Sequence, residues 1–191
     1  HSMTWFDWSV FPVLETDRLQ LRALERDDAD ALFLLRADAL SQQYEDSLPF
    51  TRLDQAFVLI EQAWAAFYEH RAITWGVSHS NSGSFIGTVS LNALDFKHQR
   101  ATLHYNFNRD LWAFAESAVA VVVRFSFEQV SLNRLSLDLH AAHLAGLDVA
   151  ERTGFLHEAT HREHYLHDGL YLDQLRYALL RRQWIAHAAG V

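Results

Sequence analysis

Histidine is the residue type in this sequence that is best suited to chemistry. The 191 residues include 12 histidines and no cysteine. A histidine can act as a general base near neutral pH or bind a metal through a ring nitrogen. The lack of cysteine excludes a thiol nucleophile, thiolate metal ligands and disulfides, which fits a reducing compartment. We therefore expect a cytoplasmic protein whose chemistry depends on histidine, tyrosine and carboxylate side chains.

Two groups of histidines raise the question of a metal site. One group recurs at a spacing of three: His161, His164 and His167. On an expected strand an odd spacing sends neighbouring side chains to opposite faces, so these three form no ligand set unless the strand is broken. His140 and His143 flank another strand end and could approach His104, but no fixed zinc or iron pattern is present. We expect no metal and interpret the first group as polar surface residues.

The elements that must position such side chains follow from the hydrophobic pattern. Alternation predicts strands over residues 18–22, 72–78, 85–91, 101–108 and 134–140. Helical spacing predicts helices from Asp27 or Asp28, from Thr51 or Asp54, over 113–130 and over 144–153. Gly154 is a helix stop, and Asp168-Gly169 is a tight turn between two final strands. This order indicates an α/β (α+β) mixed sheet with helices on both faces.

Length and composition bound the organisation of the chain. With 191 residues and 50% hydrophobic content, we expect one ordered domain over residues 11–191. Residues 1–10 are interpreted as a tag remnant and an N-terminal arm. The aromatic residues expected to pack the arm onto the domain are Trp5, Phe6, Trp8 and Phe11. No run of about 18 apolar residues and no signal peptide is visible, so we expect no membrane span or export.

The charge of the chain bears on its partners. The net charge of -8 argues against a surface that binds nucleic acid and suits a cationic partner, such as an amine.

The most specific pattern lies in residues 151–184. A Glu, a Gly-Phe pair, a second Glu and an Arg precede the spacing D-G-x-Y-x-D-x-x-x-Y-x-L-L-x-x-x-W. The residues that supply this pattern are Glu151, Gly154, Phe155, Glu158, Arg162, Asp168, Gly169, Tyr171, Asp173, Tyr177, Leu179, Leu180 and Trp184. The pattern closely resembles the closing segment of the RimJ/RimL-like branch of the GNAT N-acetyltransferase superfamily, and the resemblance extends back to about Phe11.

The resemblance implies a mostly antiparallel sheet that is splayed between the fourth and fifth strands, and acetyl-CoA as co-substrate. By resemblance, strand 102–109 holds the pantetheine arm and the N-terminus of the next helix holds the diphosphate. The residues implied to bind the cofactor are Phe107, Asn108, Arg109, Trp112, Ala113, Phe114, Ala115 and His143. The implied reaction is direct attack of a primary amine on the thioester in a ternary complex. The amine belongs to a small molecule or a protein N-terminus, and the protein can be a homodimer.

Candidate catalytic and acceptor residues follow from the same resemblance. His104, Tyr105 and His143 are the catalytic candidates, although alternation places His104 and Tyr105 on opposite faces of their strand. The residues expected to bind the acceptor amine are Tyr44, Glu45, Asp46 and Trp64. The first three also fit a solvated loop, and Trp64 also fits core packing.

The chain departs from the family pattern on the cofactor side. The phosphate loop is two residues short, Ala113 replaces a glycine, and Glu116 lies in the first helical turn. His143 and Gly146 replace a polar Asn and Ser, and Ala150 stands where many members carry a tyrosine acid. An alternative is therefore a binding or regulatory protein with the fold but no transferase activity. A further alternative is a shifted CoA pose held by Arg109.

Overall fold

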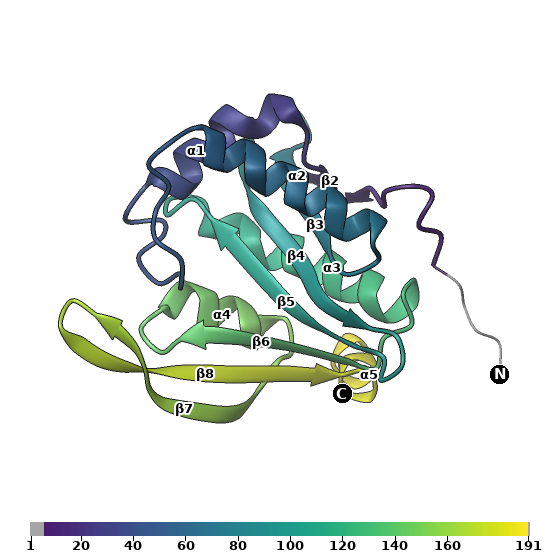
Figure 1. Cartoon of the computed structure of the whole chain (residues 1–191). Helices are drawn as coiled ribbons and strands as arrows, with labels where there is room; N and C mark the ends of the chain where they lie inside the picture. Colours follow the sequence, from purple (N-terminus) through teal and green to yellow (C-terminus); the bar gives the residue numbers. More distant parts are fainter. Residues whose placement is uncertain (1–5, 191) are drawn as a thin grey trace.

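An eight-stranded mixed sheet organises residues 6–190, the part of the chain that this computed structural model describes (Figure 1). The strands are β1 (Leu14–Glu15), β2 (Leu19–Ala23), β3 (Ile73–His79), β4 (Phe85–Asp95), β5 (Arg100–Phe107), β6 (Arg134–His140), β7 (Leu156–His167) and β8 (Leu170–Leu180). They lie in the order β1-β2-β3-β4-β5-β6-β8-β7, and every neighbouring pair is antiparallel except β5 and β6. The expected mixed, mostly antiparallel sheet is confirmed.

Helices cover both faces of the sheet, as expected. The α-helices are α1 (Ala29–Ala37), α2 (Asp54–Tyr68), α3 (Ala115–Glu128), α4 (Leu144–Arg152) and α5 (Arg181–Ala188), and 3-10 turns precede α1 at Arg26–Asp28 and α3 at Trp112–Phe114. In Figure 1, α1 and α2 lie in front of the sheet, and α3 and α4 lie behind it. No helix within residues 6–190 is long and apolar enough to cross a membrane.

Side-chain alternation on β5 assigns its two faces to different layers. Ala101, Leu103, Tyr105 and Phe107 are almost fully buried and pack in the main core with α3, whereas His104 and Asn106 point toward the α1–α2 side. Burying one such large apolar side chain stabilises the fold by about 1.5–3 kcal/mol. The apolar face therefore fixes the strand, and the other face is free to carry polar groups.

The sheet opens between β5 and β6. These two strands pair in parallel only where Arg100–Thr102 meets Arg134–Ser136, and they carry no ladder toward their carboxyl ends. Figure 1 shows them diverging toward the side where the α1–α2 loop hangs. The splay expected between the fourth and fifth strands is present here. These strands are numbered β5 and β6 because the short β1 precedes them.

The C-terminal hairpin has the expected turns. Gly154 has φ +96°, and Asp168 and Gly169 have φ +48° and +78°, so both positions use the left-handed region that suits a helix stop and a two-residue hairpin turn. The sequence pattern did not predict α5. Its Trp184 stacks on Phe127 with ring centroids 5.3 Å apart, which docks this last helix on the core.

The N-terminal arm packs on the domain, as expected, for the residues that the structure describes. Phe6 meets the edge of Phe125 at 5.5 Å, and both Trp8 and Phe11 contact Phe67 at about 5 Å. Trp5 lies outside the described residues.

Candidate active site

The loop between α1 and α2 crosses the open end of the splay (Figure 1). On one side, Ser41 Oγ accepts a hydrogen bond from the Arg109 backbone N–H at 3.0 Å, just beyond β5. On the other side, the Tyr44 ring stacks on His143, with centroids 5.3 Å apart. The loop therefore holds both strands of the splay and brings its own polar side chains between them.

A partly buried chain of hydrogen bonds connects this loop to β5. His104 Nε2 lies 2.9 Å from Glu45 Oε2, and Asn106 Nδ2 donates to Glu45 Oε1 at 2.8 Å. The buried Gln42 donates from Nε2 to Asn106 Oδ1 at 2.9 Å and to the Leu35 carbonyl at 3.1 Å. Because these partners are fixed from three elements, the carboxylate of Glu45 has one orientation toward His104.

Glu45 is ionised in this setting. Burial raises the pKa of its carboxyl group, but the charges and hydrogen bonds of His104, Asn106 and Arg36 outweigh burial and lower that pKa to about 2. An ionised carboxylate only accepts, so His104 donates its Nε2–H to Glu45. Within residues 6–190, His104 Nδ1 has no hydrogen-bond partner, and in this tautomer it is an acceptor. This is the arrangement that prepares a histidine to take a proton.

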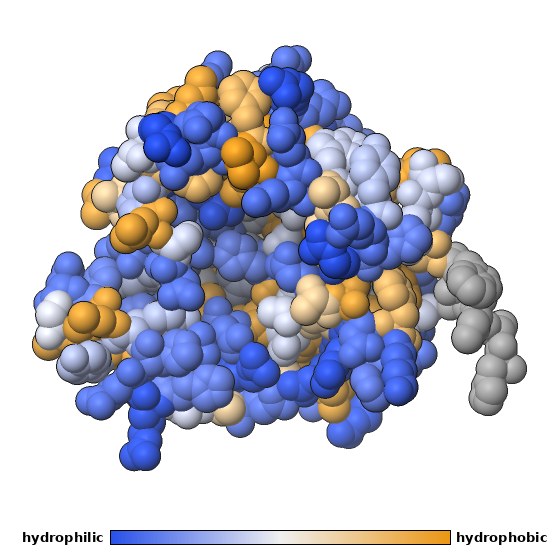
Figure 2. Space-filling model, in the orientation of Figure 1, coloured by the Kyte–Doolittle hydropathy of each residue, from blue (hydrophilic) through white to orange (hydrophobic). Residues whose placement is uncertain are grey.

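A cavity of about 520 Å³ lies beside His104, between the sheet and α2. Its floor is made of polar side chains from adjacent strands: Thr74, Thr88, Ser90, Asn92 and His104. The remaining lining residues are Arg36, Leu59, Gln62, Ala63, Ala66, Arg71 and Ala72. Figure 2 shows a largely hydrophilic hollow in the middle of this face. We call this cavity the trough, and it gives a small polar molecule access to His104.

Tyr105 serves the opposite face of the sheet, as alternation predicts. Its hydroxyl donates to the Gly146 carbonyl in α4 at 2.7 Å, and its side chain is only 3% exposed. Burial, with the nearby Tyr177, raises the pKa of this hydroxyl far above its usual value. Tyr105 therefore keeps its proton and holds α4 to the sheet, on the side away from the trough.

His143 caps α4 and closes part of the splay. Its Nδ1 accepts the Gly146 N–H at 3.2 Å, and its ring meets Trp112 edge-on at 4.8 Å. Burial lowers the pKa of His143 to about 4, so the ring is neutral at pH 7 and a weak base. The geometry favours a structural contribution of this candidate, which positions the starts of α3 and α4 relative to Tyr44.

Several other histidines make aromatic contacts. His140 stacks on Tyr165 at 5.0 Å and lies 5.2 Å from Tyr44. The strand break that would bring the spaced histidines together does occur, since β7 shifts register after His161, and the rings of His161 and His164 are 5.7 Å apart. Within residues 6–190, no group of three or more histidine, aspartate or glutamate side chains is arranged to hold a metal ion.

The residues expected to hold the CoA diphosphate form a tight turn. Several backbone N–H groups in this turn already have acceptors: Arg109 donates to Ser41, Asp110 to Asn108 Oδ1, Leu111 to the Asn108 carbonyl and Phe114 to the Leu111 carbonyl. The Arg109 guanidinium lies 3.6 Å from Asp38 and 4.0 Å from Asp110. These donors must exchange partners before they can bind a phosphate.

The remaining sequence candidates divide between core and surface. Phe107 and Ala115 are fully buried in the main core, and Phe114 packs edge-on to His79 at 4.6 Å. Ala113 and Asp46 are exposed. Trp64 donates its indole N–H to the Leu24 carbonyl at 2.7 Å and joins the two hydrophobic clusters, so it does not line the trough.

The structure fits the two ends of acetyl-CoA unequally. Beyond Thr102, β5 has no ladder partner on the β6 side, and such an open strand edge suits the amide groups of a pantetheine arm. The diphosphate end meets a turn whose amides are largely occupied and a first helical turn that carries Glu116. The residues of this chain thus fit the pantetheine arm in the conformation observed. They would fit the diphosphate only after the turn has rearranged.

Three residues of the site were not predicted from the sequence: Gln42, Asn106 and Arg36. Asn106 lies two positions after His104 on an alternating strand, so its place on the same face was a signal that could have been used. Gln42 and Arg36 come from the α1–α2 region, and no local pattern relates them to β5.

Comparisons with known proteins bear on this site. The family profile described as acetyltransferase (GNAT) domain matches residues 18–156. The chain is 29% identical over 174 residues to the uncharacterized N-acetyltransferase YoaA of Bacillus subtilis (strain 168), covering 90% of this chain and 98% of that protein.

Solved structures share the fold. A spermidine N-acetyltransferase from Vibrio cholerae, in complex with CoA and spermine, superposes with a TM-score of 0.78 at 22% identity, covering 89% of this chain and 99% of that one. RimL, an alpha-N-protein acetyltransferase in complex with coenzyme A, superposes with a TM-score of 0.80 at 19% identity, covering 88% and 98%.

Proposed function

This chain belongs to the GNAT acetyltransferase family, and we propose that it transfers acetyl from acetyl-CoA to a primary amine with His104 as general base. Membership of the family supports acetyltransferase activity over the alternative of a binding protein without activity. The observation that carries the assignment of His104 is its hydrogen bond to the ionised Glu45 at the splay, with Nδ1 left free beside the trough.

The residues of the chain account for the proton transfer. A primary amine is protonated near neutral pH and must lose a proton before it can attack. His104 Nδ1 accepts this proton, and Glu45 stabilises the imidazolium that forms through the Nε2–H hydrogen bond. Asn106 holds the second carboxylate oxygen, so Glu45 keeps its orientation while the charge on His104 changes.

The donor lies on the other side of the same opening. Acetyl-CoA supplies a thioester carbonyl that a deprotonated amine can attack. The open edge of β5 beyond Thr102 would hold the pantetheine arm, and the residues from Asn108 to Ala115 would hold the diphosphate. Tyr44, between the loop and His143, would border the point where donor and acceptor meet.

The acceptor is an amine that reaches His104 from the α1–α2 side. The solved neighbours include enzymes named for a polyamine and for a protein N-terminus, so both a small amine and an N-terminal amine are within the scope of this fold. Glu45 and Asp46 are proposed to attract the ammonium form of the acceptor. We also propose that the protein is cytoplasmic and that it can form a homodimer. Both proposals are based on the sequence and the family resemblance.

The test is a rate assay of free thiol release from acetyl-CoA with a panel of primary amines. We expect His104→Ala to lower kcat by about 100-fold or more, since a positioned general base contributes roughly 10²–10⁴-fold. Glu45→Gln should lower kcat to a similar extent because it removes the charge that orients His104. The matched control is His98→Gln in the β4–β5 turn, which should leave the rate unchanged.

Two further results decide the assignment. Melting curves of each variant show whether the fold is retained. A folded His104→Ala variant with an unchanged kcat and pH profile would exclude His104 as the base, and no thiol release with any amine would contradict the proposed reaction.

A further inference from the structure

Arg36 is a charged side chain without a hydrogen-bond partner. It lies in the last turn of α1 and is largely buried, and its side chain makes no hydrogen bond or ion pair within residues 6–190. Its Nε has no accessible surface and no partner, and Arg36 is one of the residues that line the trough. Burial lowers the pKa of Arg36, and only the nearby charge of Glu45 opposes this effect.

Such an arrangement calls for an anion. A guanidinium has five N–H donors and stays charged in proteins, and a buried charge without hydrogen-bond partners is costly. The charge of Glu45 acts on Arg36, but the carboxylate is oriented toward His104 and Asn106 and makes no hydrogen bond or ion pair with the guanidinium. A ligand that enters the trough could supply the hydrogen-bond partner that Arg36 lacks.

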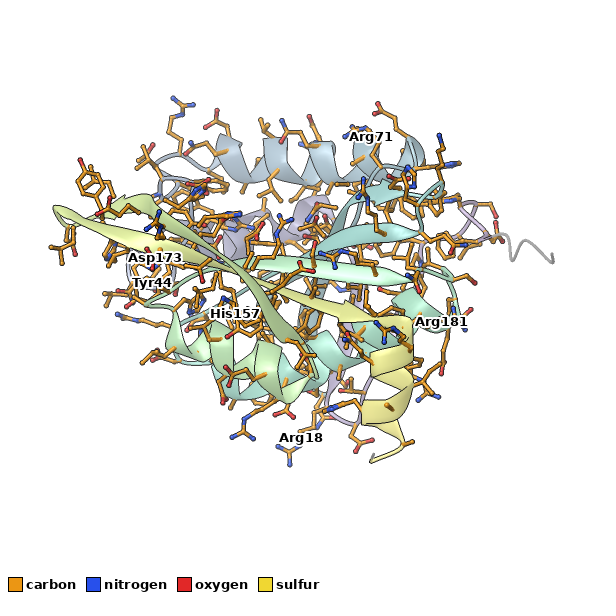
Figure 3. All side chains as sticks on the ribbon, turned by 90° about the horizontal axis from the view of Figure 1, so that it is seen from below. Arg18, Tyr44, Arg71, His157, Asp173 and Arg181 are labelled. Carbon is orange, nitrogen blue, oxygen red and sulfur yellow. The ribbon has the colours of Figure 1, made fainter. Side chains whose placement is uncertain are left out.

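The lining of the trough fits the same ligand chemistry. Its residues include two arginines and no aspartate or glutamate; Arg71 is paired with Glu69 at 2.6 Å, whereas Arg36 has no ion pair. Figure 3 shows Arg71 just beyond the end of α2 and far from Tyr44, so this second arginine lies away from the splay. Hydroxyl and amide groups between them, such as Ser90 and Asn92, can bind a carboxylate or water.

We propose that the acceptor is a small amine that also carries a carboxylate, and that Arg36 binds this carboxylate while the amine lies at His104. This inference rests on the proposed function, because His104 receives the amine only if the chain transfers acetyl groups. Arg36 and His104 line the same cavity of about 520 Å³, a size that suits a molecule such as an amino acid. A polyamine would bring further positive charge against two arginines.

The experiment compares amino acids with the amines that lack their carboxylate, for example phenylalanine with phenethylamine, and adds spermidine. Two readouts are used: KM in the thiol-release assay, and the shift in melting temperature without acetyl-CoA. We expect a lower KM and a larger shift for the carboxylated member of at least one pair. Arg36→Gln should raise the KM of that amino acid by about tenfold or more and leave its partner amine nearly unchanged.

Controls separate this site from general charge effects. Arg26→Gln removes an exposed arginine that pairs with Glu61 outside the trough, and it should leave both members of each pair unchanged. Arg36→Lys keeps the charge and should restore part of the lost affinity. If Arg36→Gln fails to fold, the comparison of each amino acid with its partner amine on the unchanged protein tests the proposal.

The outcomes distinguish the two proposals. Equal KM values and equal melting shifts within every pair, or a preference for spermidine, would overturn the carboxylate site even if acetyl transfer is fast. No acetyl transfer to any amine would contradict the proposed function. The melting shifts would still test whether Arg36 binds a carboxylate, because binding of an amino acid does not require the reaction.

Discussion

Burial of the neutral His143 ring makes the stability of the fold depend on pH. The unfolded chain takes up a proton on this ring near pH 6.5, whereas the buried ring does so only near pH 4. The unfolded state thus binds more protons between these values, so stability is complete above pH 6.5 and falls as the pH drops toward 4. For Glu45, whose pKa is lowered to about 2 from 4.5, the corresponding loss begins only below about pH 4.5.

The prediction at this residue is a change in pH dependence. From pH 7 to pH 5, burial of neutral His143 should reduce the free energy of unfolding by about 2 kcal/mol. His143→Asn keeps an N-cap for α4 and removes the titrating ring, so its melting temperature should fall less over this range. The measurement is thermal unfolding at closely spaced pH values. His98→Asn should show the full decrease, and an undiminished decrease in His143→Asn would contradict this account.

Single residues also show what the sequence could predict about the site. His104 and Tyr105 were placed on opposite faces of one strand by alternation alone, and the structure has them there. The contact between His104 and Glu45 spans 59 positions and depends on how a loop folds over the sheet. No local pattern encodes such a contact, so Glu45 was predicted to bind the acceptor but not to orient the histidine.

At the scale of elements, β5 and the turn after it treat the two ends of acetyl-CoA differently. The open strand edge would suit pantetheine, whereas several amide donors in the turn from Asn108 to Phe114 already bind internal acceptors. We therefore expect the diphosphate to contribute little net affinity. S-acetylpantetheine should replace acetyl-CoA with a KM raised by no more than about tenfold, a loss of about 1.4 kcal/mol.

The measurement is the KM of both donors with one amine at saturation. The control compares coenzyme A with pantetheine as inhibitors. The ratio of their inhibition constants should be similar to the ratio of the KM values of the two donors. A preference of about a thousandfold for acetyl-CoA would mean that the turn rearranges and binds the diphosphate fully.

The elements themselves were largely predictable. The strands and helices from residue 18 to residue 153 follow from apolar spacing, and the final hairpin follows from Asp168-Gly169. Two elements were not predicted. The two-residue β1 is too short for a pattern, and α5 is a helix with no buried residue, held mainly by the contact of Trp184 with Phe127. Tertiary packing, and not local spacing, determines both.

At the scale of the whole molecule, the sheet separates the proposed sites of the two substrates. The trough lies on the α1–α2 side, the cofactor-side residues lie toward α3 and α4, and the splay joins them. Both substrates can therefore be bound at once, and the sequence has no cysteine to carry an acetyl group. We expect initial-rate plots for acetyl-CoA and amine that intersect, and no acetylated protein after incubation with acetyl-CoA alone.

Mass spectrometry of the intact protein checks the second expectation, with a sample containing coenzyme A as reference. Parallel rate plots together with a stable mass increase of one acetyl group would indicate a covalent intermediate instead.

The position of Tyr44 next to Glu45 has a thermodynamic consequence. Tyr44 packs on His143 at the donor side, and its neighbour in the chain orients His104 at the acceptor side. If a bound donor displaces the Tyr44 ring and this shifts the Glu45 carboxylate, the two proposed binding equilibria share one free energy of coupling. Linkage requires this coupling to be reciprocal: by whatever factor the donor changes the affinity for the amine, the amine changes the affinity for the donor.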